Sequence, residues 1–180
     1  MIIGAVALVF GGCGGGETSA AEAFRNLDLT VAALDGRAVA LRDGRVGFPD
    51  EGIEVVLDGL HLTGSLDSER GEVTAGFLYT NREGALSEIE LVVALRREGE
   101  EMQHLGSRLL GGPFRVEGIR YEAGEIVVYL LDYSLDDPPC CPTISLQRRF
   151  HLVDGEVREV EVVDPDSEER VPEGAIETPA

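Results

Sequence analysis

The sequence predicts an all-β fold, an antiparallel β-sandwich or partly closed barrel built from hairpins, with a short N-terminal helix before it. From Leu29 onward, short runs rich in Val, Ile and Leu recur at near-regular spacing, and no run keeps a helical period. Asp-Gly, Glu-Gly or Ala-Gly pairs separate many of these runs, and such pairs tolerate the positive φ of tight hairpin turns. Many short strands joined by hairpin turns are typical of antiparallel sandwiches and barrels.

Length and charge narrow the classes of function. The chain has 180 residues, and a single domain takes about 100–200 residues, so one compact domain is expected. Hydrophobic residues make up 43% of the sequence, which is too many for a wholly disordered chain. The 34 acidic and 15 basic side chains give a formal charge of -19. Such a surface repels phosphate groups, which argues against nucleic acid and anionic lipid surfaces as partners.

The N-terminus carries an apolar run, Ile2–Phe10, followed by a glycine-rich stretch that contains Cys13. A helix needs about 20 apolar residues to span a bilayer, so this run is too short and instead has the length of the apolar region of a secretory signal. The tetrapeptide Phe10-Gly11-Gly12-Cys13 resembles a bacterial lipobox, which implies that Cys13 receives lipid and becomes the mature N-terminus. An ordinary buried strand is the alternative, because periodicity does not distinguish the two in so short a run.

Composition then divides the chain into four parts. Residues 1–13 are expected to be the lipoprotein signal segment, and residues 14–28 a flexible linker with a short helix. That helix is predicted over Thr18–Arg25, because Ser19 is a good N-cap and Glu22 follows three residues later. Residues 29–163 are expected to form the β domain. Residues 164–180 are rich in Asp, Glu and Pro and are predicted to be a disordered acidic tail.

Strands are predicted wherever an apolar run lies between turn signals. They are Leu29–Leu34, Ala38–Arg42, Ile53–Leu57, His61–Leu66, Val73–Thr80, Glu88–Arg97, Glu101–Leu109, Phe114–Tyr121, Ile126–Tyr133, Ile144–Val153 and Val157–Val163. In Phe114–Tyr121 the alternation of charged residues breaks at Gly118, which predicts a bulge. A similar break falls within Val157–Val163. Ile126–Leu131 is apolar on both faces and is predicted to be a central strand.

Cys140 and Cys141 are adjacent in a proline-framed loop, Asp136–Thr143. In an oxidising compartment the two thiols are expected to form a vicinal disulfide. Consecutive Cα atoms lie about 3.8 Å apart, below the usual disulfide range of about 4.4 Å or more, so such a bond is strained and more reducible. The favoured interpretation is that the pair stiffens the loop, with a redox or ligand-contact role as the alternative. A copper or zinc site would need further ligands, which no neighbouring spacing supplies.

An acidic stretch, Gly64–Glu72, resembles a degenerate form of the G-D-L-D-G-D-G pattern of calcium-binding β-loops. In those loops alternate carboxylates converge on a cation. Its weak candidate ligands are Asp67, Glu69 and Glu72. Ser65 replaces the first carboxylate, and Arg70 would oppose a cation. We therefore expect an acidic hairpin loop and no metal site.

No catalytic or cofactor-binding residue is predicted. His61, His104 and His151 are isolated from one another, each in a predicted strand. Ser145, His151 and Asp154 have the residue types of a catalytic triad. Neither their spacing nor a nucleophile-elbow motif indicates that they meet. P-loop, dinucleotide-binding and H-E-x-x-H motifs are likewise missing from the sequence.

Several of these segments recur in one known layout. Their order is the acidic stretch Gly64–Glu72, then Leu105–Leu109, the strand Phe114–Tyr121 and its turn, and finally Asp137–Pro142. The chain resembles uncharacterised bacterial secreted lipoprotein domains in which G-D-L-D-G-D-G is followed by L-G-D-R-V and later by C-C-P. The resemblance spans Leu29 to Val163 and implies a location in the cell envelope and a β fold. It implies no catalytic residues.

The sequence therefore predicts a lipoprotein held in the bacterial cell envelope through a lipid anchor at Cys13, facing the periplasm or the exterior. Its β domain is expected to bind an envelope or extracellular partner without catalysing a reaction. An envelope redox or metal-binding protein that uses Cys140 and Cys141 is the alternative.

Overall fold

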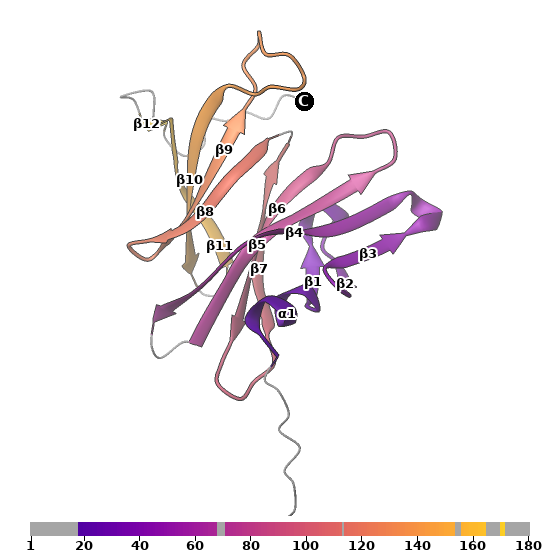
Figure 1. The fold of residues 1–180 in the computed structure, drawn as a ribbon, viewed down its shortest axis with the longest axis vertical. Helices are drawn as coiled ribbons and strands as arrows, with labels where there is room; N and C mark the ends of the chain where they lie inside the picture. Colours follow the sequence, from indigo (N-terminus) through magenta and orange to yellow (C-terminus); the bar gives the residue numbers. More distant parts are fainter. Residues whose placement is uncertain (1–17, 68–70, 113, 154–155, 165–169, 172–180) are drawn as a thin grey trace, which may run out of the picture.

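The computed structural model describes residues 18–67, 71–112, 114–153, 156–164 and 170–171, and its fold is all-β with antiparallel pairing throughout. Two five-stranded sheets and a two-stranded hairpin make up the domain, as Figure 1 shows. Neither sheet closes into a barrel, so of the two predicted architectures the sandwich is the one observed. No helix in the described part of the chain is long and apolar enough to cross a membrane.

The N-terminal layer comprises a helix, α1 (Ala20–Arg25), and a hairpin of β1 (Asp28–Val31) and β2 (Arg37–Ala40), with a 3-10 turn, η1 (Ala32–Leu34), between the two strands. The predicted cap of α1 is confirmed, because Ser19 Oγ accepts a hydrogen bond of 3.1 Å from the Glu22 N–H. The strand predicted over Leu29–Leu34 is shorter than expected, because its second half forms the turn.

The first sheet has the strand order β3-β4-β5-β6-β7. Its strands are β3 (Arg45–Phe48), β4 (Ile53–Asp67), β5 (Gly71–Arg82), β6 (Glu88–Arg96) and β7 (Gln103–Gly111), with a 3-10 turn, η2 (Pro49–Glu51), between β3 and β4. The second sheet has the order β12-β11-β10-β9-β8. Its strands are β8 (Arg115–Glu122), β9 (Glu125–Asp132), β10 (Ile144–Val153), β11 (Glu156–Val163) and β12 (Arg170–Val171).

The first sheet is the middle layer of the domain, with one hydrophobic cluster on each of its faces. On one face, Phe77 and Leu91 pack with Val128 and Phe150 of the second sheet. On the other face, the N-terminal layer packs against residues of β4, β5 and β6 that include Val55, Leu78, Val92 and Ala94. Strands β5 and β6 are therefore buried on both sides over most of their length.

Local chemistry explains which predicted turns form. Asp43-Gly44 and Ala123-Gly124 both have positive φ at each residue and close tight hairpins, as predicted. Asp58-Gly59 does not turn the chain. It lies inside β4, at a register shift between Leu57 and His61 opposite β5, so the two strands predicted on either side of it are one strand.

The two breaks in alternation are confirmed as irregularities in strand pairing. In β8 the register against β9 shifts between Val116 and Gly118. Between β10 and β11 it shifts at Arg149 and Phe150. The predicted central strand, β9, does lie between two neighbours, with Ile126, Val127 and Val128 all buried.

Two short strands lie outside the predicted set. β3 has only four residues and one glycine, which gives too weak a hydrophobic pattern. β12 lies within the predicted acidic tail and pairs with the end of β11. The rest of the tail, residues 165–169 and 172–180, lies outside the described residues, as do Cys13 and the signal segment.

Candidate functional site: the Cys-Cys loop

Residues 133–143, called the Cys-Cys loop below, connect β9 to β10 and contain both adjacent cysteines. In Figure 1 this loop lies at the upper end of the molecule, and α1 lies at the lower end of the domain. The long strands β9 and β10 carry the loop away from the core. The site is thus positioned by a rigid sheet and is remote from the N-terminal layer.

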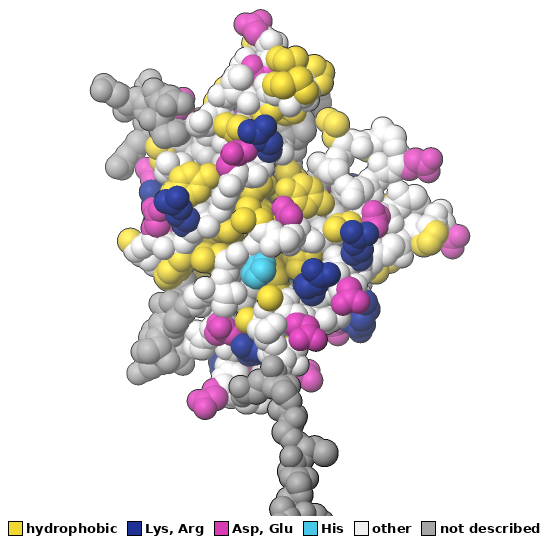
Figure 2. Space-filling view, viewed as in Figure 1, with side chains coloured by type: hydrophobic (Ala, Val, Ile, Leu, Met, Phe, Trp, Pro, Cys, Tyr) yellow, Lys and Arg dark blue, Asp and Glu magenta, His cyan; other side chains and the backbone are white. Residues whose placement is uncertain are grey.

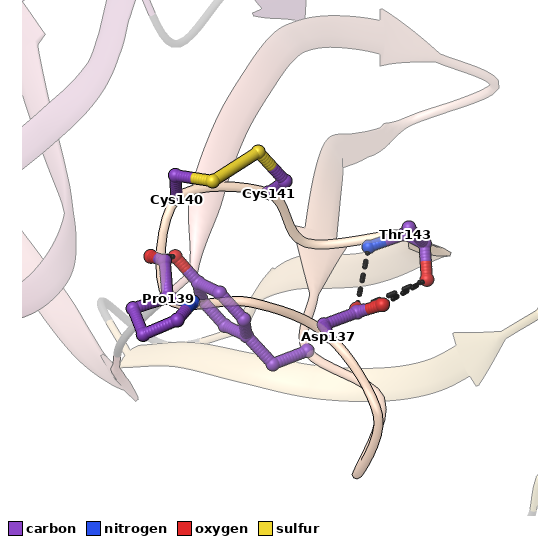
Figure 3. Close-up of a disulfide and its surroundings, with 6 residues drawn as sticks. Asp137, Pro139, Cys140, Cys141 and Thr143 are labelled. Carbon is purple, nitrogen blue, oxygen red and sulfur yellow. Dashed lines mark hydrogen bonds between the residues drawn. A yellow bond between two sulfur atoms is a disulfide. The ribbon is translucent and has the colours of Figure 1, made fainter.

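Cys140 and Cys141 are joined by a disulfide, with their Cα atoms 3.8 Å apart. Both residues are exposed. Figure 3 shows the bridge projecting from the loop, while Asp137 and Thr143 meet on the other side of the backbone. The sulfur atoms are therefore within reach of a molecule in solution.

Asp137 closes the base of the loop. Its carboxylate accepts hydrogen bonds from the Ser134 N–H (2.8 Å), the Thr143 N–H (2.9 Å) and the Thr143 hydroxyl (2.8 Å). We call this set of contacts the Asp137 clamp. The bond from the Ser134 backbone, followed by those from Thr143, holds the pKa of Asp137 below its ordinary value.

Two further hydrogen bonds order the tip. The Tyr133 hydroxyl donates to the Pro139 carbonyl (2.8 Å), and the Cys141 N–H donates to the Pro138 carbonyl (3.0 Å). With two prolines fixing φ as well, little freedom is left to the backbone before the bridge. The loop is consequently ordered before any ligand arrives, which lowers the entropy cost of binding.

The ordered tip exposes several apolar side chains together with the acid Asp136. Leu135 is fully exposed, and Pro138 and Pro139 are exposed beside the two cysteines. Hydrophobic side chains gather at the same upper end of the molecule in Figure 2. Exposed apolar groups on a rigid loop are typical of a contact surface for another molecule.

Of the three weak candidate calcium ligands, only the Glu72 side chain lies among the described side chains. The Glu72 carboxylate lies 2.6 Å from Arg96 Nη2 in an ion pair. Glu69 lies outside the described residues, and of Asp67 only the backbone, paired with Gly71, is described. Within the described ranges no three His, Cys, Asp or Glu side chains are placed to hold a metal ion.

The three histidines lie on three different strands. His61 Nδ1 lies 3.0 Å from the Gly59 carbonyl oxygen. Half-burial lowers the pKa of His104 below its ordinary value. His151 Nε2 lies 2.8 Å from Glu125 Oε1. Ser145 is six residues from His151 on the same strand, a separation of roughly 20 Å at the usual rise per residue. These two residues are therefore too far apart to act together in a catalytic triad.

Sequence reasoning missed the charged outer face of the second sheet. There Glu125 accepts a hydrogen bond from Arg149 Nη1 at 2.8 Å and also contacts His151, while Arg149 lies 3.6 Å from Glu161 and 3.7 Å from Glu122. The pKa of Glu125 is lowered by the bond from Arg149 first and by His151 second. The adjacent pair Arg148 and Arg149 in β10 was the only signal, and the pairing of side chains across strands cannot be read from one strand.

No protein-family model, curated protein or solved structure matches the chain. The resemblance to secreted lipoprotein domains therefore stays a prediction, as does lipidation at Cys13.

Proposed function

We propose that this protein is a lipid-anchored lipoprotein of the bacterial cell envelope whose β domain binds a partner, without catalysis, through the Cys-Cys loop. The observation that carries the binding role is the ordered and exposed apolar tip formed by Leu135, Pro138 and Pro139 beside the disulfide. The observation behind the anchor is the lipobox-like sequence ending at Cys13.

The position of the loop agrees with such a role. α1, the first described element after the expected tether, and the Cys-Cys loop lie at opposite ends of the domain in Figure 1. A domain tethered through its N-terminus would thus present the loop away from the membrane. The net charge of -19 would also keep the domain off an anionic lipid surface.

A photo-crosslinking experiment in native cells tests the binding role. A photoreactive side chain at position 135 is expected to give a discrete cross-linked product. The matched control is position 86, because Leu86 is also an exposed leucine, 71% accessible, but lies in the turn between β5 and β6. Equal products from both positions, or none from position 135, would contradict binding through the loop.

The anchor has its own test. Palmitate labelling of the full chain in a host with a lipoprotein pathway should be lost in Cys13→Ala and kept in Cys140→Ala. Labelling that survives Cys13→Ala would overturn the anchor while leaving the binding role open.

A further inference from the structure

The Cys140–Cys141 disulfide is badly placed to stabilise the fold. A disulfide stabilises a protein mainly by closing a loop in the unfolded chain, and the effect grows with the length of that loop. This bridge joins neighbours, with a sequence separation of 1, so it encloses no intervening residue. Its presence therefore calls for a role other than cross-linking the β domain.

The same bond is open to chemical attack. Both cysteines are exposed, and their Cα atoms are 3.8 Å apart. Ordinary disulfides span about 4.4–6.8 Å between Cα atoms, and bonds outside that range are more easily reduced. An incoming thiolate can thus reach the sulfur atoms without any movement of the sheets.

Opening the bridge would leave the base of the loop in place. The Asp137 clamp and the bond from Tyr133 to Pro139 involve no sulfur atom. Both thiols would stay adjacent on a restrained backbone after reduction, ready to form the bond again. Local restraint of this kind favours reversible exchange over irreversible unfolding.

We propose that Cys140 and Cys141 are a reversible dithiol–disulfide switch that changes the binding tip of the Cys-Cys loop; the regulatory part of this inference rests on the proposed function. The co-reactant is an exposed protein dithiol. Its thiolate attacks one sulfur of the bridge, the bond between Cys140 and Cys141 breaks, and the other cysteine leaves as a thiolate that takes up a proton. The second thiol of the dithiol then resolves the mixed disulfide. The loop gains two electrons and two protons, and the dithiol becomes a disulfide.

The two states present different surfaces. In the disulfide, the side chains of both cysteines are locked together next to Pro138 and Pro139. In the dithiol, each side chain rotates independently and carries a weak S–H donor. A partner that recognises the locked apolar tip would bind the oxidised protein more tightly.

Redox titration of the full chain tests the switch without needing the partner. The protein is equilibrated in buffers of oxidised and reduced dithiothreitol, the free thiols are alkylated, and the product is weighed by mass spectrometry. We expect complete and reversible conversion in the folded protein, with amide NMR shifts confined to residues 133–143. A bridge that opens only when the β domain is unfolded by denaturant would overturn the proposal, as would shifts spread over both sheets.

A charge-matched pair of variants tests the role of the clamp. Asp137→Asn removes the clamp carboxylate, and Asp136→Asn removes the same charge from its exposed neighbour. We expect Asp137→Asn to lower the equilibrium constant for closing the bridge roughly tenfold, because the restraint on the thiols is lost, and Asp136→Asn to change it little. Equal effects of the two variants would mean that charge, and not the clamp, controls the bond. If the redox titration succeeds while cross-linking at position 135 fails, the switch stands and the binding role falls. If the titration fails while cross-linking succeeds, the binding role stands and the switch falls.

Discussion

The carboxylate of Glu90 accepts hydrogen bonds from the backbone N–H of Ala32, with both oxygens 3.0 Å from that nitrogen. Glu90 is fully buried in β6, and Ala32 begins the 3-10 turn between β1 and β2. Glu90 also accepts a longer bond, 3.4 Å, from the Ala33 N–H. A buried acid in a core strand thus fastens the N-terminal layer to the first sheet.

Replacing Glu90 should therefore destabilise the protein. Glu90→Ala would leave the part-buried Ala32 N–H and the buried Ala33 N–H without this acceptor, at a cost of about 2 kcal/mol in the free energy of unfolding. Glu90→Gln keeps one acceptor oxygen and should cost less. Urea denaturation measures both, with the exposed Glu54→Ala as the control. A Glu90→Ala protein as stable as the control would mean that the contact is not formed.

The ion pair between Arg148 and Glu159 should show strong coupling. Arg148 Nε lies 2.5 Å from Glu159 Oε1, both side chains are about nine-tenths buried, and Arg148 also donates to the Leu110 carbonyl. Removing one partner leaves a buried charge, so Arg148→Met or Glu159→Gln should each cost about 3–5 kcal/mol. The double variant should cost less than the sum of the two. Additive costs in a double-mutant cycle would contradict the coupling.

Stability should fall in acid partly through Glu125. Its pKa is lowered in the folded protein, because Arg149 and then His151 contact the carboxylate. Such a group stabilises the fold above its unfolded pKa, near 4.5, and the contribution is lost as the pH falls through the lower folded value. Thermal unfolding between pH 7 and pH 3 should show a shallower loss for Glu125→Gln than for the original protein. Parallel curves below pH 4.5 would rule the effect out.

Gly76 should not tolerate a side chain. A Cβ atom there would lie 2.8 Å from Cε1 of Phe24 in α1 and 3.3 Å from the Leu60 carbonyl oxygen. Gly76→Ala should thus push α1 away from β5 and cost about 1–3 kcal/mol. Gly59→Ala in β4 is the matched control, because nothing lies within 4 Å of its Cβ position. Thermal unfolding compares the two, and equal melting temperatures would show that α1 does not pack at Gly76.

The parts of the fold that could be predicted are those fixed by neighbours in sequence. The N-cap at Ser19 and the turns at Asp43 and Ala123 depend on backbone conformations that the local residues favour. Asp58-Gly59 carries the same turn signal, but pairing of β4 with β5 on both sides of it keeps the chain extended. Here tertiary contacts outweigh local preference.

Among the site residues, the adjacency of Cys140 and Cys141 was visible directly in the sequence. The Asp137 clamp was not, because its geometry depends on where β9 ends and β10 begins. The role of Glu90 was hidden for a similar reason. Its partner Ala32 lies 58 residues away. A single acid in an apolar run does not indicate which backbone N–H groups will donate hydrogen bonds to it.

The position of the first sheet between two layers has a consequence for synthesis. The N-terminal layer leaves the ribosome before the first sheet, yet part of the surface that buries Phe24, Leu29 and Val31 is built from strands up to β6. The burial of those side chains is therefore incomplete until Ala94 has emerged. The N-terminal layer can therefore complete its packing only after strands that follow it in the sequence have been made.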